Sequence, residues 1–282
     1  MSLAVFFAVL LAAGIHAGWN TLVKGSSDKW VSIASVVVGH VLLSVLALLI
    51  LPFPSSESFP YVLVSGFIHT GYMLFLIFAY SVGDLSHVYP IARGVGPMLV
   101  TIISITFLGV VLEVGQLAGV VIVVSGILTL IFAQPITATS RQSTLLAVGT
   151  GCFIAGYSIA DGLGARVAGE YAGAPVAFFS LVCIFSALTF IPILWFKKPA
   201  AVIESMRDIK LVLIAGGGSF VAYAIVVWAF TQAPIPLVTA LRETSTIFAL
   251  LLGVMVLGEN LTLVKVIATV VTLVGAVLMK VG

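Results

Sequence analysis

Four charged residues lie inside long apolar stretches, where a charge is costly unless it is paired or hydrated: Arg93, Asp161, Arg242 and Glu243. Arginine can hold a carboxylate, phosphate or phosphonate with two parallel hydrogen bonds. Two arginines that share the single carboxylate of Glu243 would leave one cation for an anionic substrate group. The alternative is an Arg–Glu lock that joins two helices without touching substrate. The residue types allow both, and both could hold at different stages of a transport cycle.

The segments around the two arginines differ. Residues 89–97 place two prolines and two glycines around Arg93. Because proline removes a backbone donor and glycine adds flexibility, this pattern predicts a broken helix that lines a cavity. Around Arg242, the helical spacing predicts one polar stripe made of Thr239, Arg242, Glu243 and Thr246.

Several titratable side chains inside the apolar runs are candidates for carrying a proton. His16 and His69 lie deep in such runs, and neutral histidine titrates near physiological pH. Together with Asp161 and Glu243 they form the predicted proton-coupling set. The alternative for each histidine is a hydrogen bond that bridges two helices. His40 is predicted to be structural, and no histidine, cysteine or carboxylate spacing predicts a metal site or a cofactor.

Aromatic side chains form a third group. Trp19, Tyr72, Tyr157 and Tyr223 lie away from the ends of the apolar runs and could surround an amine by cation–π attraction, although each taken alone is explained by packing. The full predicted substrate-binding set is Arg93, Arg242, Glu243, Trp19, Asn20, Tyr72, Tyr89, Tyr157 and Tyr223.

The elements that must position these residues follow from composition. Charged residues make up 8% of the 282 residues, against about 25% in a soluble domain, and apolar residues reach 61%. Continuous apolar runs long enough to cross a bilayer predict an all-α integral membrane protein of ten transmembrane helices. The runs are 3–23, 30–51, 60–80, 87–110, 114–133, 144–164, 174–196, 210–231, 237–257 and 261–280. The first is predicted to be a retained helix, because no basic region precedes it.

An internal repeat divides the chain into residues 1–135 and 142–282. Leu108-Gly109 recurs as Leu257-Gly258, Gly126 as Gly275, and Arg93 as Arg242, all at one constant offset. Because five helices are an odd number, the second half must be inverted relative to the first, around a central cavity. Inverted repeats are typical of transporters.

The distribution of lysine and arginine predicts an orientation. One set of alternate loops carries eight basic residues, whereas the opposite face carries only Arg166 and Lys280. The positive-inside rule therefore places both termini outside the cytoplasm.

The ten-helix pattern, the two halves and the ending Leu257-Gly258-Glu259 before a last apolar helix resemble the drug/metabolite transporter superfamily, in particular its EamA-like family. The segment from His16 to Lys24 resembles the opening helix of a branch that includes proteins associated with phosphonate utilisation. The resemblance implies a central cavity with alternating access in the inner membrane. It also implies cytoplasmic termini, in conflict with the charge count, and both orientations stay open.

The predicted function is secondary transport of a small zwitterionic or anionic metabolite, such as an amino acid or an aminophosphonate. One alternative is efflux of hydrophobic or cationic compounds. Another is a lipid-carrier translocase or membrane-embedded enzyme, but HExxH and GxSxG motifs are absent and no enzyme is predicted. No GxxxxGK[ST] motif or basic cluster is present, so neither ATP nor nucleic acid is an expected partner. The expected partners are lipid, substrate, and a proton or counter-substrate, with the chain a monomer or homodimer.

Overall fold

The structure is a computed structural model that describes residues 1–24, 28–83, 85–133, 141–257 and 261–282. The first half contains α1 (Leu3–Lys24), α2 (Lys29–Ile50), η1 (Ser56–Ser58), α3 (Phe59–Val82), α4 (Leu85–Thr106), α5 (Val114–Thr129) and η2 (Leu130–Ala133). The second half contains α6 (Arg141–Arg166), α7 (Ala174–Lys197), α8 (Pro199–Arg207), α9 (Ile209–Leu211), the π-helical segment η3 (Val212–Gly216), α10 (Gly217–Gln232), α11 (Ile235–Arg242), α12 (Ser245–Leu257) and α13 (Leu263–Val281).

The prediction of a helical membrane protein is confirmed. Within the described ranges, nine helical segments are long and apolar enough to cross a membrane, and α5 is a shorter apolar helix of 16 residues. Each of the ten predicted apolar runs overlaps helical structure. The run 237–257 corresponds to α11 together with α12, and the run 261–280 corresponds to α13. The count of ten crossings stays a prediction. The short helix α8 between α7 and α9 was not predicted.

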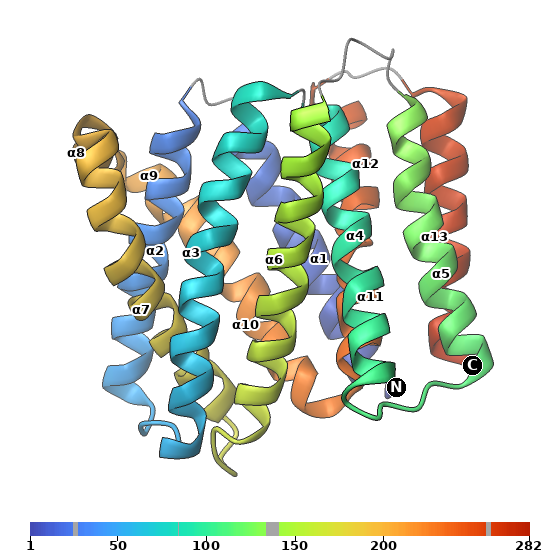
Figure 1. Cartoon of the computed structure of the whole chain (residues 1–282), viewed down its shortest axis with the longest axis horizontal. Helices are drawn as coiled ribbons and strands as arrows, with labels where there is room; N and C mark the ends of the chain where they lie inside the picture. Colours follow the sequence, from blue (N-terminus) through green and yellow to red (C-terminus); the bar gives the residue numbers. More distant parts are fainter. Residues whose placement is uncertain (25–27, 84, 134–140, 258–260) are drawn as a thin grey trace.

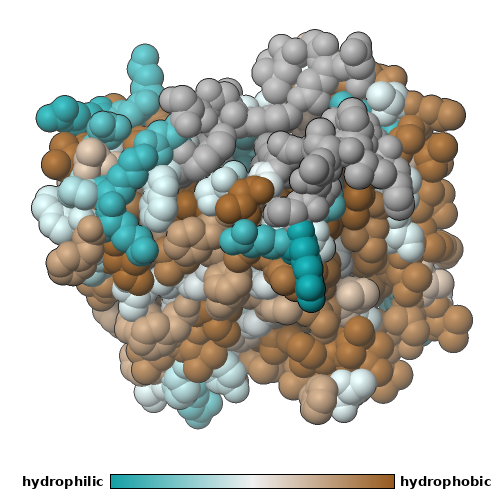
Figure 2. All heavy atoms as spheres, turned by 45° about the horizontal axis from the view of Figure 1, so that its top comes forward, coloured by the Kyte–Doolittle hydropathy of each residue, from teal (hydrophilic) through white to brown (hydrophobic). Residues whose placement is uncertain are grey.

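The surface and the interior have the polarity expected of a protein in lipid. Large apolar side chains cover the outside, among them Phe67, Leu188 and Val270, and Figure 2 shows this brown surface below a hydrophilic rim. Serine, threonine and charged side chains are buried inside instead, including Arg93 and Asp161. The polar groups that could interact with a ligand therefore lie between the helices.

Most of the larger helix contacts join the part of the chain before residue 134 to the part after residue 140. At one end of the bundle α5 packs against α13, and at the other end α2 packs against α7 (Figure 1). In the middle, α3 packs against α6 and α10 packs against α1, while α4 contacts α6 and α12 contacts α1. Both chain termini lie at the same end of the helices (Figure 1).

Glycines bring α5 and α13 unusually close. A Cβ atom added to Gly275 would lie 2.7 Å from the carbonyl oxygen of Gly119, and one added to Gly126 would lie 2.4 Å from Thr272 Oγ1. Such small-residue contacts let transmembrane helices approach until their backbones touch. Gly126 and Gly275, which the repeat aligns with each other, thus both lie in this one interface.

The predicted break in the helix around Arg93 is wrong, because α4 is continuous from Leu85 to Thr106. Each proline lacks the N–H that would bond the carbonyl four residues earlier, but prolines are tolerated in membrane helices where neighbouring groups satisfy the freed backbone. The two glycines serve packing instead. A Cβ on Gly94 would meet Leu128, and one on Gly96 would meet Ile154.

The break occurs instead in the second half, between α11 and α12. The N–H groups of Glu243 and Thr244 bond carbonyls three residues back, at 3.1 and 3.0 Å, which tightens the turn. The hydroxyl of Thr244 donates to the carbonyl of Leu241, and that of Thr246 to Glu243, each at 2.8 Å. Hydroxyl side chains compete in this way with helical hydrogen bonding, so a run of three hydroxyl residues ends α11 without proline or glycine.

Some predicted signals lie outside the described residues. These are Gly258 of the predicted repeat and Glu259 of the ending that resembles the family.

An ion pair joins the start of α2 to the end of α7. Lys198 Nζ lies 2.6 Å from Asp28 Oδ2, and the Asp28 carboxylate also accepts from the backbone N–H of Trp30 at 2.9 Å. Partial burial would raise the pKa of Asp28, but Lys198 and the backbone N–H groups together hold this pKa below its ordinary value. A carboxyl group with a lowered folded-state pKa stabilises the fold above its unfolded pKa and loses that effect on acidification.

We expect Asp28→Asn to lower the stability of the purified protein at pH 7 by less than about 1 kcal/mol, because the pair is partly exposed. The difference from the unsubstituted protein should shrink as the pH falls below about 4 and vanish below the lowered folded-state pKa, where both forms are uncharged at this position. Thermal unfolding in detergent across this pH range measures the effect, with Lys198→Ala as the partner variant. A difference that grows on acidification would contradict the assignment.

Candidate functional site

A buried group of three charges lies where α4 meets the break between α11 and α12. Arg93 Nε lies 2.5 Å from Glu243 Oε2, and Arg242 Nη2 lies 3.6 Å from Glu243 Oε1. The Glu243 side chain is fully buried, and those of Arg93 and Arg242 are 7% and 5% exposed. One arginine from each half therefore shares a single carboxylate. We call Arg93, Arg242 and Glu243 the charged triad.

Polar and aromatic neighbours hold the two guanidinium groups. Arg93 Nη2 donates to Ser245 Oγ at 2.6 Å, and its guanidinium lies 5.5 Å from the centre of the Tyr89 ring. Arg242 lies 5.9 Å and 5.4 Å from the ring centres of Tyr157 and Tyr223. The hydroxyl of Tyr157 also accepts from Arg242 Nη2 at 3.4 Å. These contacts fix the orientation of both cations.

Several buried polar atoms in and around the triad have no hydrogen-bond partner within the described ranges. The carboxylate oxygens of Glu243 lack hydrogen-bond geometry as well, but both are engaged in the ion pairs with the two arginines. In the described residues, atoms that have neither a hydrogen bond nor an ion pair include Arg242 Nε, Thr239 Oγ1, Ser158 Oγ and Trp19 Nε1. Buried polar groups are normally satisfied by protein, water or ligand. This region therefore has unused capacity to bind a polar molecule.

A second polar group surrounds Asp161 on α6, whose side chain is fully buried. Its carboxylate accepts from the hydroxyl of Ser65, from Tyr223 at 2.8 Å, and contacts His69 Nε2 at 3.0 Å. Ser65 and His69 come from α3 and Tyr223 comes from α10. We call Asp161, Ser65, His69 and Tyr223 the Asp161 group.

Stacked aromatic rings connect the Asp161 group with the charged triad. The His69 ring lies parallel to Tyr157, with ring centres 4.3 Å apart and an interplanar angle of 18°. Tyr157 also meets Tyr72 edge-on at 5.4 Å and Tyr223 at 5.8 Å. The predicted aromatic residues Tyr72, Tyr157 and Tyr223 thus converge from α3, α6 and α10.

The residues predicted on α1 form a smaller cluster of their own. The Asn20 amide hydrogen-bonds His16 Nε2 at 3.0 Å, and the His16 ring meets Trp19 edge-on at 5.1 Å. His16 also interacts electrostatically with Arg93 and Arg242. This cluster therefore borders the charged triad.

The other histidines lie apart from the triad. His40 Nδ1 lies 3.7 Å from Cys183 Sγ between the rings of Phe179 and Phe220, as expected for a packing role. His87 contacts Thr144 Oγ1 at 3.2 Å.

Two serines in these contacts were not predicted: Ser65 and Ser245. Serine is common in membrane helices, so residue type alone does not single it out. The spacing does contain a signal, because Ser65 precedes His69 by one helical turn and therefore lies on the same face of α3. Ser245 follows Glu243 by two residues and lies on the far side of the helix break.

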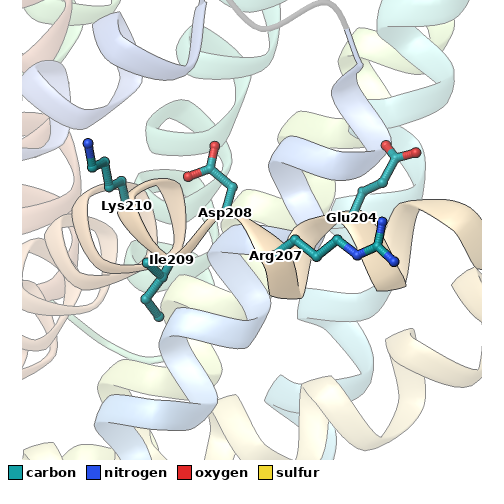
Figure 3. Close-up of a pocket in the computed structure, with 5 residues that line it drawn as sticks. All are labelled: Glu204, Arg207, Asp208, Ile209 and Lys210. Carbon is teal, nitrogen blue, oxygen red and sulfur yellow. The ribbon is translucent and has the colours of Figure 1, made fainter.

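A surface pocket of about 410 Å³ lies at the turn between α8 and α9, lined by Glu204, Arg207, Asp208, Ile209 and Lys210. Figure 3 shows the charged end of Lys210 on the opposite side from those of Glu204 and Arg207, so the charged groups do not meet at one point. Ligand sites instead bring a few polar groups together on one point. The pocket is therefore not the candidate site.

The fold and the buried charges define a class: a multi-pass helical membrane protein with an ionised centre. Residues 143–281 match the EamA-like transporter family. The second half of the chain thus matches this family, which supports the predicted resemblance to EamA-like proteins of the drug/metabolite transporter superfamily. The matched segment contains Tyr157, Asp161, Tyr223, Arg242 and Glu243.

A solved structure agrees on the fold. This structure is described as "Crystal structure of protein". Its sequence is 16% identical to that of this chain, and the two folds superpose with a TM-score of 0.73. The similarity covers 98% of this chain and 94% of that chain, and at this identity it shows the fold alone. No curated protein matches the chain significantly.

Proposed function

We propose that this protein is a secondary transporter that moves a small anionic or zwitterionic metabolite across the inner membrane by alternating access. The observation that carries the proposal is the charged triad, in which two buried arginines share one carboxylate. A buried charge is costly and is kept where it has a partner or a task. Within the triad, the arginine that Glu243 does not neutralise can bind an anionic group of the substrate.

The unpartnered atoms support substrate contact over a purely structural lock. A lock that only joins helices gains most when every donor and acceptor is satisfied. Here the Nε atom of Arg242 and the hydroxyl of Thr239 are buried without a hydrogen-bond partner in the described chain. A carboxylate or phosphonate that enters this region could accept from the arginines, and a substrate ammonium group could donate to Glu243.

The packing of the two halves supports alternating access. In an inverted repeat of five helices each, the contact of α3 with α6 corresponds to that of α10 with α1, and both are present. In this repeat α13 is the counterpart of α5, and α7 is the counterpart of α2. The contacts α5–α13 and α2–α7 therefore each join a helix to its own counterpart, as expected beside a pseudo-two-fold axis. This arrangement supports ten crossings, because both termini lie at one end. Two such halves can exchange shapes to open the centre to either side.

The aromatic rings favour a substrate that also carries an amine. Tyr157 and Tyr223 lie between the arginines and Asp161, and ring faces attract cations. An amino acid or an aminophosphonate has the required combination of one ammonium group and one anionic group.

A second candidate is efflux of hydrophobic cations. It is favoured by Asp161, a fully buried carboxylate beside the rings of His69 and Tyr223. Resistance of cells to lipophilic cations would support this alternative. Against it, the carboxylate already accepts from three neighbouring side chains.

Exchange measurements in proteoliposomes test the proposal. Liposomes loaded with unlabelled alanine, glutamate or 2-aminoethylphosphonate should take up the same labelled compound by counterflow. We expect Arg93→Ala to lower the initial rate by about tenfold or more at subsaturating substrate, because a charge-assisted hydrogen bond contributes about 1.5–3 kcal/mol.

Lys198→Ala is the matched control, since it removes a cation that is 41% exposed at a helix end and should leave the rate unchanged. Equal rates in Arg93→Ala and the unsubstituted protein would remove Arg93 from the substrate site. Protection against lipophilic cations without any counterflow would favour the second candidate.

A further inference from the structure

The Asp161 group is a buried cluster of titratable side chains. The proposed binding of the substrate anion at Arg93 and Arg242 does not involve it. We propose that His69 and Asp161 form a proton-binding site that fills together with the anionic group at Arg93 and Arg242, so that the protein carries one proton with each anion. This inference rests on the proposed function for the anion. It names the coupling ion and the residues that bind it.

The geometry leaves one position for an additional proton. An ionised carboxylate only accepts hydrogen bonds, so the His69 Nε2 atom that lies 3.0 Å from Asp161 carries its hydrogen. Nδ1 is then the basic nitrogen of the neutral ring. The Asp161 side chain is fully buried, whereas His69 is 14% exposed. His69 is therefore the member of the pair that can take up a proton, and Asp161 stabilises the resulting cation.

Two tyrosines link this pair to the charged triad. Tyr157 stacks on His69 and accepts a hydrogen bond from Arg242. Tyr223 donates to Asp161 and presents its ring to Arg242 at 5.4 Å. Only one ring therefore separates His69 from the Arg242 guanidinium, and the two sites are close enough for their charges to interact.

Charge balance couples the two sites. With His69 neutral, the positive charges of Arg93 and Arg242 balance the negative charges of Glu243 and Asp161. The anionic group of a substrate bound at the arginines adds negative charge beside His69, and a proton on His69 offsets that charge. Because buried net charge is costly, each event favours the other, and this linkage is reciprocal.

The other titratable groups around His69 and Asp161 come from several helices. His40 on α2 interacts electrostatically with His69, and Cys183 on α7 interacts with Asp161. The remaining neighbours in the described chain are Tyr72 on α3, Tyr157 on α6, Tyr223 on α10, Tyr89 and Arg93 on α4, His16 on α1, and Arg242 with Glu243 around the helix break. When the histidines are neutral, only Arg93, Arg242, Glu243 and Asp161 in this neighbourhood carry charge.

The first test needs no substrate. The imidazole of His69 can be titrated by NMR in the full protein with labelled histidine, and His69→Gln assigns its signal. Arg242→Gln removes one positive charge, as a bound anion would neutralise it, and should move the titration midpoint up by about half a pH unit or more. Glu243→Gln should move it down. Lys198→Ala, far from the group in the fold, should leave it unchanged.

Opposite shifts in these two variants support the coupling, and each variant checks the other against general misfolding. Equal midpoints in Arg242→Gln, Glu243→Gln and the unsubstituted protein would overturn the inference. Shifts of the same sign would also overturn it, because they would report a structural disturbance and not the charge.

The second test measures proton movement with alanine and 2-aminoethylphosphonate as probes. An inward gradient of a transported probe should acidify proteoliposomes that contain the dye pyranine. His69→Gln should lose accumulation driven by a pH gradient but keep counterflow exchange, which needs no net proton transfer. Transport without acidification, or pH-driven accumulation by His69→Gln, would overturn the inference. Failure of every probe in counterflow would count against the proposed function, while the NMR shifts still decide the proton site.

Discussion

Glu243→Gln is expected to abolish transport and to lower the stability of the protein by about 3–5 kcal/mol. The substitution leaves Arg93 and Arg242 buried beside each other without the carboxylate that now lies 2.5 Å from one and 3.6 Å from the other. Two like charges in a low-dielectric interior repel strongly, and neither can be deprotonated. Thermal unfolding in detergent measures the loss of stability, and counterflow in proteoliposomes measures the loss of transport.

The double variant Arg93→Gln/Glu243→Gln separates a helix lock from a substrate site. It removes one cation and the carboxylate together, so one arginine remains and the like-charge repulsion disappears. We expect stability to recover by at least half of the loss seen in Glu243→Gln, whereas transport stays at background. A lock without substrate contact predicts that transport recovers together with stability.

The expected result would be contradicted by a Glu243→Gln protein that is as stable as the unsubstituted one. In that case the carboxyl group is not needed as the counter-ion of the arginines. Ser245→Ala provides the matched control for the Arg93 side chain, since it removes one hydrogen bond without changing any charge.

Gly39→Ala is the second substitution with a large expected effect, about 1–3 kcal/mol of lost stability. Gly39 on α2 packs directly on the π-helical segment η3. A Cβ at this position would lie 2.5 Å from the carbonyl oxygen of Val212 and 2.7 Å from the Cα atom of Gly216. Both obstacles are backbone atoms, which cannot rotate away, so the two helices must separate.

Gly14→Ala on α1 is the control for this substitution, because in the described chain an added Cβ would meet no atom within 4 Å beyond the nearby backbone of its own helix. It should leave the stability unchanged or raise it by up to about 1 kcal/mol, since alanine favours helix more than glycine. The measurement is thermal unfolding of both variants in detergent. A Gly39→Ala protein as stable as Gly14→Ala would show that α2 and η3 do not pack backbone to backbone.

The helices could be predicted from the sequence because lipid imposes a strong constraint on it. A crossing segment must satisfy its backbone internally and expose apolar side chains, so long apolar runs identify helices directly. The predicted run 174–196 corresponds to α7 (Ala174–Lys197), and the run 3–23 to α1 (Leu3–Lys24). The interruption in the second half was not predicted, since it depends on threonine and serine hydroxyls that also occur in unbroken helices.

Part of the candidate site could also be predicted from the sequence, because charged residues are rare in apolar segments. Arg93, Arg242 and Glu243 are conspicuous in apolar surroundings, and the repeat aligns the two arginines, so their proximity could be inferred. The contact of His69 with Asp161 could not be, because it depends on how α3 packs against α6. Residue type identified both as candidates for carrying a proton, but only the tertiary structure makes them a pair.

The interruption at residues 243–244 creates two helix ends, and these ends favour Arg242 before Glu243 in the sequence. An α-helix has a partial negative charge at its C-terminus and a partial positive charge at its N-terminus. Arg242 is the last residue of α11, and Glu243 lies just before α12 begins at Ser245. Each side chain therefore lies beside the helix end of opposite sign, a favourable placement by about 0.3–2 kcal/mol. Exchanging the two residues would keep the net charge but oppose both macrodipoles, so the sequence Arg-Glu, and not only the pair, is matched to this interrupted helix.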